Sequence, residues 1–508
     1  MEDLNQVLRV RREKLQALRQ AGIEPFAYGY ERSHPSAEAR ALFEAAEGAA
    51  ELSDTRDGPR VAVGGRIVGW RGHGKSAFAH IEDGAGRIQT YLKKDVLGDE
   101  RFERLDLLDL GDWIGVEGPT FRTRTGEVTV RAETWTLLTK SLRPLPFGKV
   151  ETDPDTGERI THSGFADQEA RYRQRYADLA VHPEVRERFR TRARIVTSLR
   201  AFLDGEGFLE VETPVLQPLY GGASAKPFVT HHHALDQKMY LRIADELYLK
   251  RLVVGGLDRV YEISKDFRNE GLSRVHNPEF TMLEWYQAFA DYHDQMDLVE
   301  RMVIHVLDEV VGARAVTYGE HEIRFELPFR RLGLLDGLGR ALQMNVHEAG
   351  EDVLREKARQ LRIPDLEGAG RGKLIDKLFA ELVEPELIQP TFVMDHPREL
   401  SPLAKVHRDD LRLTERFELY IGGAEVFNAF TELNDPLDQR ARFEAQAALR
   451  DAGDEEAQQV DEDFLRALEY GMPPTGGVGM GVDRFVMILT NQASIRDVIL
   501  FPTLRNEE

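Results

Sequence analysis

Apolar and polar residues alternate in different ways along this chain of 508 residues. At residues 1–24, leucine and valine recur every three or four positions among arginine and lysine, which predicts an amphipathic helix ending near Ala21-Gly22. Residues 60–140 instead form short segments with a two-residue period, separated by turns, which predicts a small all-β barrel or sandwich. The helical period returns at residues 185–203, and Gly205-Glu206-Gly207 ends that helix.

The second half of the chain is mostly alternating. A strand is predicted at residues 208–213, and alternating segments predominate to about residue 290 and again from about 413 to 434. The stretch from about 340 to 385 is helical and charged, so we expect an insertion between the two alternating blocks. These patterns predict an α+β fold with several domains, as the chain length also favours at about 150 residues per domain.

Composition indicates where the domains meet. Prolines and the turn Asp155-Thr156-Gly157 precede an arginine-rich helix start, which is typical of a linker. We therefore expect a helical extension at 1–58, a β domain at 59–142, a linker at 143–178 and a large α+β domain at 179–508, with its helical insertion at about 335–390.

The net charge is misleading as an average. A formal charge of −21 and a pI near 5.3 argue against a polyanionic partner. Locally, however, residues 60–94 carry seven basic and two acidic residues, and residues 186–200 carry six and one. Residues 451–463 carry seven acidic residues and no basic one. Such runs are usually solvated faces, so their place in the fold must decide what they mean.

Composition also excludes whole classes of protein. The chain has no cysteine, so it has no disulfide, thiol nucleophile or thiolate metal site, which suits a reducing cytoplasm. Its 42% hydrophobic and 31% charged residues are typical of a soluble globular protein. We see neither a secretory signal nor a long uncharged apolar run, and therefore expect a cytoplasmic location and no membrane partner.

Two motifs are poor guides in their context. Residues 69–76 match the P-loop pattern, but a P-loop needs a following helix whose N-terminus holds phosphate. The next residues alternate as a strand, so a β-hairpin connection is predicted instead. His231-His232-His233 cannot converge on one metal ion without a bend, because consecutive strand residues point to opposite faces.

Polar side chains occupy an inward face in the first alternating block. On the predicted strand at 279–286, Phe280, Met282, Glu284 and Tyr286 share one face by the two-residue period. A carboxylate and a phenol therefore lie where an apolar face is expected. A buried carboxylate needs a cationic partner or a changed pKa, and an internal salt bridge is the alternative to a binding site.

The second alternating block carries its own polar set among apolar residues. Its members are Glu418, Glu425, Asn428 and Glu432. Carboxylate oxygens suit Mg²⁺, which keeps several waters and binds substrate phosphates through one or two protein carboxylates. The set therefore indicates a magnesium and phosphate site.

Arginines complete this chemistry. Arg484 lies in the glycine-rich turn at 476–485, where a ligand can approach closely and a guanidinium can meet phosphate. Arg268 and His276 lie near the first block, and we find no Ser/His/Asp or Cys/His arrangement. The set favours phosphoryl or nucleotidyl transfer, which depends on positioning and charge neutralisation.

Three segments follow one another at characteristic spacing: residues 207–214 behind the arginine-rich helix, residues 267–270 with 276–280, and residues 479–484. They resemble motifs 1, 2 and 3 of the class II aminoacyl-tRNA synthetases and, within that class, the lysyl-tRNA synthetases. The resemblance runs nearly end to end. It implies an N-terminal OB-fold β-barrel that binds the anticodon, and a class II catalytic domain built on an antiparallel β-sheet flanked by helices.

The resemblance implies a lysine site. Glu246 with Gly222 would receive the α-amino group, and Glu432 with Tyr286 would hold the ε-ammonium group. The implied set is Gly222, Glu246, Arg268, Glu284, Tyr286, Asn428, Phe430 and Glu432.

It likewise implies an ATP site, with Arg268 and Arg484 as catalytic residues. Phe280 would stack on adenine, and Glu418 and Glu425 would ligate Mg²⁺, of which up to three ions accompany ATP. The implied ATP set is Arg268, Glu270, His276, Asn277, Phe280, Glu418 and Arg484.

The implied reaction has two steps. Lysine attacks the ATP α-phosphate to give lysyl-adenylate and pyrophosphate, and the terminal ribose of tRNA(Lys) then takes the lysyl group. Lysine, ATP and tRNA(Lys) are the implied partners, and motif 1 would form a homodimer. On the barrel, Phe78 would stack on an anticodon base, while Arg66, Gln89 and Glu133 would read base edges. The alternative for Phe78 is a core aromatic.

Three other functions fit parts of the pattern. An aspartyl or asparaginyl synthetase would need a pocket that reads an acid or amide, whereas Glu284, Glu432 and Tyr286 offer anions and a phenol. A relative that lysylates a protein would lack the barrel, and a non-catalytic nucleic-acid-binding or scaffold protein would have lost Arg268, Arg484 or a metal carboxylate. Asp245 departs from the usual pattern, since a proline is common there.

Overall fold

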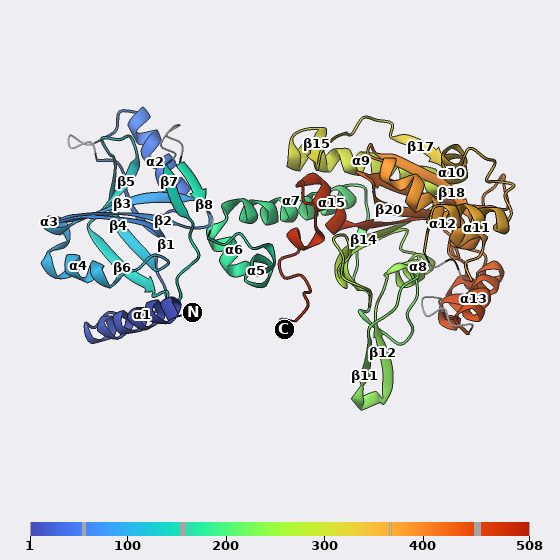
Figure 1. The fold of residues 1–508 in the computed structure, drawn as a ribbon, viewed down its shortest axis with the longest axis horizontal. Helices are drawn as coiled ribbons and strands as arrows, with labels where there is room; N and C mark the ends of the chain where they lie inside the picture. Colours follow the sequence, from blue (N-terminus) through green and yellow to red (C-terminus); the bar gives the residue numbers. More distant parts are fainter. Residues whose placement is uncertain are drawn as a thin grey trace. The chain divides into compact units, whose positions relative to one another are not determined.

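The computed structural model of the chain describes residues 2–52, 57–152, 159–162, 164–364, 366, 368–451 and 459–506. The chain divides into two compact units, Met1–Val181 and His182–Glu508 (Figure 1). Parts of the linker at 143–178 and of the acidic run at 451–463 lie outside the described residues. Among the helices of the described residues, none has the length and apolar character needed to span a membrane.

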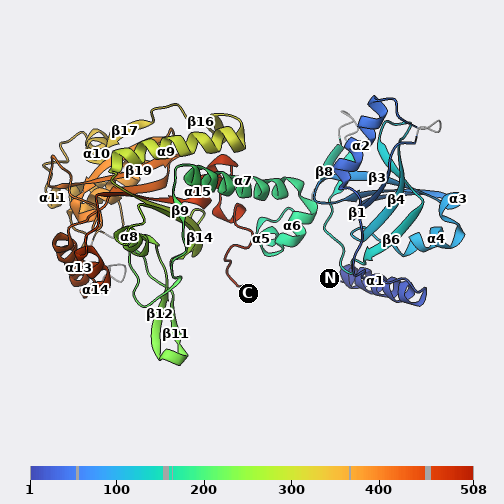
Figure 2. The same ribbon diagram turned by 180° about the vertical axis from the view of Figure 1, so that it is seen from behind.

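The first unit is built around a β-barrel, as its alternating pattern predicts. The chain begins with α1 (Glu2–Gln20), which confirms the predicted amphipathic helix, and α2 (Ser36–Gly48). Six strands follow: β1 (Arg60–His73), β2 (Ser76–Glu82), β3 (Arg87–Lys93), β4 (Trp113–Arg122), β5 (Val128–Ala132) and β6 (Thr134–Thr139). Their order is β1-β2-β3-β5-β4-β6, and β1 also pairs with β4, which closes the barrel (Figure 2).

Several helices and strands of this unit were not predicted from the sequence. Short helices α3 (Lys94–Leu97) and α4 (Asp99–Glu103) lie between β3 and β4. The linker predicted at 143–178 contains a two-stranded ribbon, β7 (Lys149–Thr152) and β8 (Arg159–His162), and the helix α5 (Gln168–Arg173). Helix α6 (Arg175–Val181) begins in it and ends three residues beyond it. The P-loop-like segment at 69–76 comprises the end of β1, the turn with Gly74 at φ +54°, and the first residue of β2. The predicted hairpin is therefore confirmed.

The second unit has an eight-stranded sheet at its centre. Along the sheet the order is β17 (Arg330–Gly333), β18 (Thr391–Pro397), β19 (Leu413–Ile421), β20 (Ala424–Thr431), β21 (Thr475–Gly481), β14 (Glu279–Ala288), β13 (Arg259–Phe267) and β9 (Leu209–Glu210). The six central strands run antiparallel, whereas the edge strands β17 and β9 pair in parallel with their neighbours. The predicted antiparallel sheet is thus mixed at its edges.

Helices cover one face of this sheet with the main hydrophobic core. They are α7 (Pro183–Gly205), α9 (Tyr292–Val306) and α15 (Val482–Leu489), and α7 and α9 run along the sheet in Figure 2. Ile195, Met302 and Phe485 pack from these helices onto Trp285 and Phe427 of the strands. Because this face is apolar and filled, polar chemistry is left to the other face.

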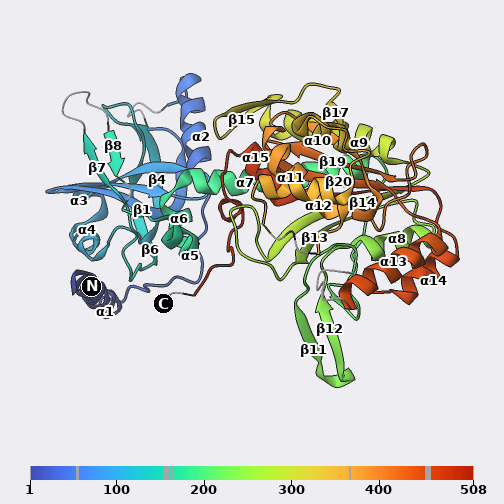
Figure 3. The same ribbon diagram turned by 45° about the vertical axis from the view of Figure 1, so that its right-hand side comes forward.

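The remaining elements surround the sheet. A hairpin of β11 (Val229–His232) and β12 (Gln237–Leu241) projects from the unit beside α8 (Glu246–Val254) (Figure 3). The helical stretch between β17 and β18 contains α10 (Leu334–Leu342), α11 (Glu351–Gln360) and α12 (Arg371–Leu382). The others are β10 (Leu216–Gln217), β15 (Ala315–Tyr318), β16 (His321–Arg324), α13 (Pro436–Asp451) and α14 (Glu462–Glu469).

The strand predicted at residues 208–213 is wrong in its length. Only Leu209 and Glu210 pair with β13, and the chain leaves the sheet edge after the N–H of Val211 donates to the carbonyl of Tyr261 at 2.9 Å. The backbone N–H and the hydroxyl of Thr213 both donate to Glu262 Oε2, at 3.1 and 2.7 Å. The side chain of Glu262 thus replaces the hydrogen bonds that a longer strand would have made.

Candidate active site

A cavity of about 350 Å³ opens in the second unit. Its walls come from β14, β20 and β21, from α8 and from the loop that joins β13 to β14. Nearly all of the residues predicted for the lysine and ATP sites line it: Gly222, Glu246, Arg268, Glu270, His276, Asn277, Phe280, Glu284, Tyr286, Glu425, Asn428, Phe430, Glu432 and Arg484. Glu418 does not line this cavity.

Glycines on β21 create the space for this cavity. Strand β14 pairs with β21 so that Met282, Glu284 and Tyr286 lie opposite glycines. A Cβ atom built on Gly477 would collide with the side chains of Glu432 and Tyr286. The inward face predicted for β14 therefore remains open to a ligand.

One end of the cavity is anionic. Tyr286 donates a hydrogen bond to Glu284 Oε2 at 3.1 Å, and both side chains are buried. Burial, followed by the charge of Asp245, raises the pKa of Glu284 well above its usual range. Burial and the charge of Glu284 raise the pKa of Tyr286, so the phenol stays protonated and remains a donor. A cationic ligand would find carboxylates here that lack a full complement of partners.

Lys250 belongs to this anionic end, and our sequence reasoning missed it. Its side chain is fully buried, with Nζ 2.5 Å from Glu246 Oε1 and in ion-pair contact with Glu432 Oε2. Burial raises the pKa of Glu432, and the charge of Lys250 opposes that effect. Glu246 and Lys250 are four residues apart and share one face of α8, but the sequence analysis predicted alternating segments in this region and no helix, so the spacing gave no signal.

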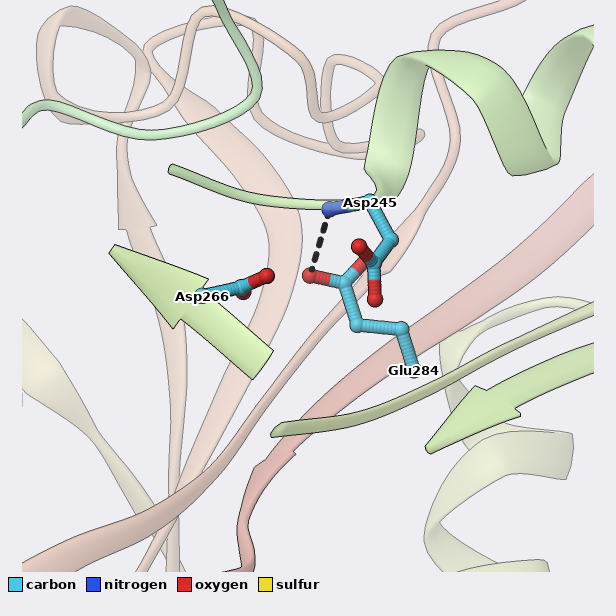
Figure 4. Close-up of side chains that lie close together, drawn as sticks. All are labelled: Asp245, Asp266 and Glu284. Carbon is cyan, nitrogen blue, oxygen red and sulfur yellow. Dashed lines mark hydrogen bonds between the residues drawn. The ribbon is translucent and has the colours of Figure 1, made fainter. Parts of the chain in front are cut away.

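Glu284 belongs to a cluster of three buried carboxyl groups, together with Asp245 and Asp266 (Figure 4). Their oxygens come within 4.8 Å of one another, and the backbone N–H of Asp245 donates to Glu284 Oε1 at 3.4 Å. Arg242 pairs with Asp245 at 3.1 Å and with Asp266 at 3.4 Å. Burial is the largest cause of the raised pKa values in this cluster, and it raises the pKa of Asp266 to about 6.

The other end of the cavity is cationic. The guanidinium of Arg268 lies over the ring of Phe280, 5.1 Å from its centroid, and donates to the carbonyl of Ile243 at 3.3 Å. Arg484 donates to His276 Nε2 at 3.2 Å. Burial and the positive charge of Arg484 lower the pKa of His276, so the imidazole is neutral at physiological pH. This end offers planar donors suited to phosphate.

Arg416 links Glu418 on β19 to Asn428 on β20 and was also missed. It lines the cavity and donates to Asn428 Oδ1 at 3.1 Å and to Glu418 Oε1 at 2.5 Å. Its guanidinium lies 5.4 Å from the ring centroid of Phe430. The two-residue period places Arg416 on the same face of β19 as Glu418, and that is the signal that could have found it.

Glu425 has a distant cationic partner, Arg484. Arg484 lies 3.4 Å from Glu425 Oε2, and burial followed by the charge of Glu418 raises the pKa of Glu425. Glu418 is held by Arg416 and by the hydroxyl of Tyr420 at 2.8 Å. The arrangement leaves two neighbouring carboxylates whose repulsion a cation would relieve.

The residues predicted to read the anticodon lie on the barrel of the first unit. Phe78 on β2 lies opposite Tyr91 on β3, with ring centroids 4.6 Å apart, and is only partly buried. Gln89 donates to Glu127 Oε2 at 2.7 Å and shares the β3 face with Tyr91. Tyr91 is therefore a further aromatic on this surface, which the strand register predicts once β2 and β3 are paired.

The other two predicted positions have partners within the barrel. The guanidinium of Arg66 lies over the ring of Trp113, 4.9 Å from its centroid. Glu133 forms an ion pair with Arg60 at the start of β1. Both residues are partly exposed, so their polar groups remain accessible to a ligand.

Known proteins resemble both units. Residues 167–505 match the family described as tRNA synthetases class II (D, K and N), and residues 61–138 match the family described as OB-fold nucleic acid binding domain. A protein of Carboxydothermus hydrogenoformans named lysine–tRNA ligase is 51% identical over 505 residues, covering 99% of each chain. One of Oceanobacillus iheyensis with the same name is 50% identical over 507 residues, covering 100% of each. Another, from Pelotomaculum thermopropionicum, is 51% identical and covers 100% of this chain and 96% of its own.

Proposed function

The chain belongs to the class II tRNA synthetases (D, K and N), and on this premise we propose which of its residues carry out the reaction of a lysine–tRNA ligase. The chain activates lysine with ATP and transfers the lysyl group to tRNA. The observation that carries our assignment of residues is the polarity of the cavity, which is anionic around Glu246, Glu284 and Glu432 and cationic around Arg268 and Arg484.

Lysine occupies the anionic end. Its α-amino group binds Glu246 beside Gly222, where φ is +89° and a Cβ atom would approach Ala244 to 2.9 Å. Its ε-ammonium group binds Glu432 and Tyr286. Glu284, Asn428 and Phe430 complete the pocket. The two ammonium groups of lysine pair with these carboxylates, which offsets the free-energy cost of burying the carboxylates away from water.

ATP occupies the cationic end. Phe280 stacks on adenine, Glu270 receives its amino group, and Asn277 lines the nucleotide site. Arg268 contacts the α-phosphate and the lysine carboxylate, while His276 and Arg484 hold the β- and γ-phosphates. A neutral His276 suits this role because its Nε2 accepts from Arg484 and so orients the guanidinium that carries the positive charge.

In the first step, a lysine carboxylate oxygen attacks the α-phosphorus, and the bond from the α-phosphorus to the bridging oxygen breaks. Pyrophosphate leaves, and lysyl-adenylate remains. In the second step, a terminal ribose hydroxyl of tRNA attacks the lysyl carbonyl and AMP leaves. No side chain forms a covalent bond, so the residues act by position and by charge.

Glu418 and Glu425 fit a magnesium site, because their oxygens are hard ligands and the charge of Glu418 disfavours ionisation of Glu425 without a cation. When bound, Mg²⁺ supplies positive charge to the phosphates of ATP. The chain contributes Arg416, which keeps Glu418 oriented. Up to three ions would accompany ATP.

The barrel binds the anticodon of tRNA(Lys). Phe78 stacks on a base, and Arg66, Gln89 and Glu133 read base edges. The basic run at residues 60–94 lies on this barrel, which gives it a polyanionic partner despite the negative charge of the whole chain.

We also propose a homodimer formed through α7 and the residues after it. Strand β9 is the end of the sheet; its Leu209 is exposed, and so are Leu216 and Leu219 in the residues that follow. Exposed apolar side chains at a sheet edge are typical of an interface. Sedimentation should give the mass of two chains. The reaction serves translation, so we place the protein in the cytoplasm.

ATP–pyrophosphate exchange tests this function across the twenty amino acids. Lysine should support the fastest exchange. Faster exchange with another amino acid would contradict the lysine pocket, and no exchange at all would contradict the enzymatic function.

A further inference from the structure

Lys250 contacts both carboxylates that the proposed function assigns to the two amino groups of lysine. It lies on α8, one helical turn after Glu246, and its side chain is fully buried. It does not line the cavity. Lys250 is therefore not placed to contact the substrate, and any effect on it must pass through Glu246 and Glu432.

Each of the two carboxylates uses one oxygen for Lys250 and keeps the other toward the cavity. Glu246 Oε1 and Glu432 Oε2 contact Nζ. The second oxygen of Glu432, Oε1, lies beside Gly477, and that of Glu246, Oε2, lies beside Gly222. Both glycines line the cavity, and Glu432 Oε1 accepts no hydrogen bond among the described residues. The free oxygens thus face the space where a ligand would lie.

The charge of Lys250 has a second effect. Glu246 and Glu432 are both buried, and without a cation between them the two carboxylates would repel each other. A protonated carboxyl is a much weaker partner for an ammonium group. The charge of Lys250 lowers the pKa of Glu432, which burial raises, and so favours the ionised form that pairs with an ammonium group.

We propose that Lys250 is a positioning residue for amino-acid selection: it holds Glu246 and Glu432 at a fixed separation, with one oxygen of each directed at one amino group of lysine. The inference rests on the proposed lysine site. It adds a determinant of specificity that lies outside the pocket wall. It also assigns the contact of Lys250 with Glu432 a role beyond holding α8 to the residue that follows β20.

The test replaces Lys250 by a side chain of similar length without charge, Lys250→Met. In lysine-dependent ATP–pyrophosphate exchange, the KM for lysine should rise about tenfold or more, while the KM for ATP should change by less than about twofold. Lys140 provides a matched control. It is equally buried and contacts two carboxylates, Asp109 at 2.6 Å and Asp112 at 2.8 Å, in the barrel unit. Lys140→Met should leave the KM for lysine unchanged.

Two results would overturn the proposal: a lysine KM in Lys250→Met no higher than in Lys140→Met, or an equal rise in both KM values. Exchange by the unchanged protein tests the proposed function separately. If Lys250→Met alone does not fold, Lys250→Met combined with Glu432→Gln removes both charges together. The KM for lysine in this double variant should be higher than that of Glu432→Gln alone, because Glu246 also loses its contact with Lys250. A KM for lysine no higher than that of Glu432→Gln alone would show that Lys250 does not act through Glu246 and would contradict the proposal.

Discussion

Arg484 and His276 are 208 residues apart in sequence, and their side chains meet at 3.2 Å, from Nη2 to Nε2. An arginine stays protonated, so it is the donor, and the imidazole must accept with Nε2 unprotonated. Ser273 Oγ lies 3.0 Å from the other ring nitrogen, Nδ1, which fixes the ring. The glycine-rich turn and the loop after β13 are thereby joined at the cationic end of the cavity.

Removing this imidazole should impair ATP binding selectively. We expect His276→Ala to raise the KM for ATP by about tenfold, as for loss of one hydrogen bond to a charged group, and to leave the KM for lysine nearly unchanged. Pyrophosphate exchange with each substrate varied in turn measures both. His321→Ala, at an exposed position on β16, is the control. Equal changes in both KM values would contradict the assignment to ATP.

The reverse selectivity is expected at Glu432. Glu432→Gln keeps the shape of the side chain but removes the charge that would pair with the ε-ammonium group of lysine. Loss of a charged hydrogen bond costs about 1.5–3 kcal/mol, so the KM for lysine should rise about 10- to 100-fold, with little change for ATP. ATP–pyrophosphate exchange measures both KM values. A similar rise in the KM for lysine and the KM for ATP would mean that Glu432 does not contact lysine.

The sequence predicted the residues that line the cavity better than the buried residues that hold them in place. The two-residue period put Phe280, Met282, Glu284 and Tyr286 on one face, and all four line the cavity. Lys250 was missed because its charge is used inside the protein. A buried ion pair depends on two elements meeting in space, and local periodicity does not report such a meeting.

In the fold as well, the features set by local periodicity were predicted, and those set by distant contacts were not. Long periodic elements such as α7 and β14 were predicted, because each buries one face of a regular pattern. The strand at residues 208–213 was overextended, since its end depends on Glu262, which lies 49 residues from Thr213. The family resemblance supplied what periodicity could not, namely which carboxylate serves which substrate group. Those roles stay predictions until they are measured.

Phe78 should affect tRNA and not adenylate formation. Phe78→Ala removes a ring that stacks with Tyr91 on the barrel surface, and base stacking of this kind is worth about 1–3 kcal/mol per base. The KM for tRNA in aminoacylation should therefore rise by about tenfold or more, while pyrophosphate exchange without tRNA stays unchanged. Phe26→Ala, another exposed aromatic in the same unit, is the control. An unchanged KM for tRNA would contradict a stacking role.

Glu425 should determine the magnesium requirement. With Glu425→Gln, one hard oxygen ligand is lost, so half-maximal exchange should need a several-fold higher Mg²⁺ concentration. Titration of exchange activity with Mg²⁺ measures this. Glu399→Gln, at a partly exposed glutamate outside the cavity lining, should leave the titration unchanged. An unchanged requirement in Glu425→Gln would remove this residue from the metal site.

The carboxyl cluster of Asp245, Asp266 and Glu284 should destabilise the second unit as pH rises. In the unfolded chain these groups ionise near pH 4, whereas the folded pKa of Asp266 is about 6 and those of Asp245 and Glu284 are also raised. Between about pH 4 and pH 6 the folded state therefore binds more protons than the unfolded state. The contribution of these three groups to the free energy of unfolding therefore falls as pH rises through this window.

Asp245→Asn tests that sign directly. Asparagine is uncharged and nearly the same shape, and Arg242 keeps its contact with Asp266. At pH 4 the variant and the original chain should unfold alike, because Asp245 is then protonated. At pH 8 the variant should be more stable, by about 1–3 kcal/mol, since it no longer buries that charge. Denaturant unfolding of both chains at several pH values measures the difference, with Asp236→Asn at the exposed hairpin tip as the control. A variant less stable at pH 8 would mean that the Arg242–Asp245 ion pair outweighs the repulsion among the carboxylates.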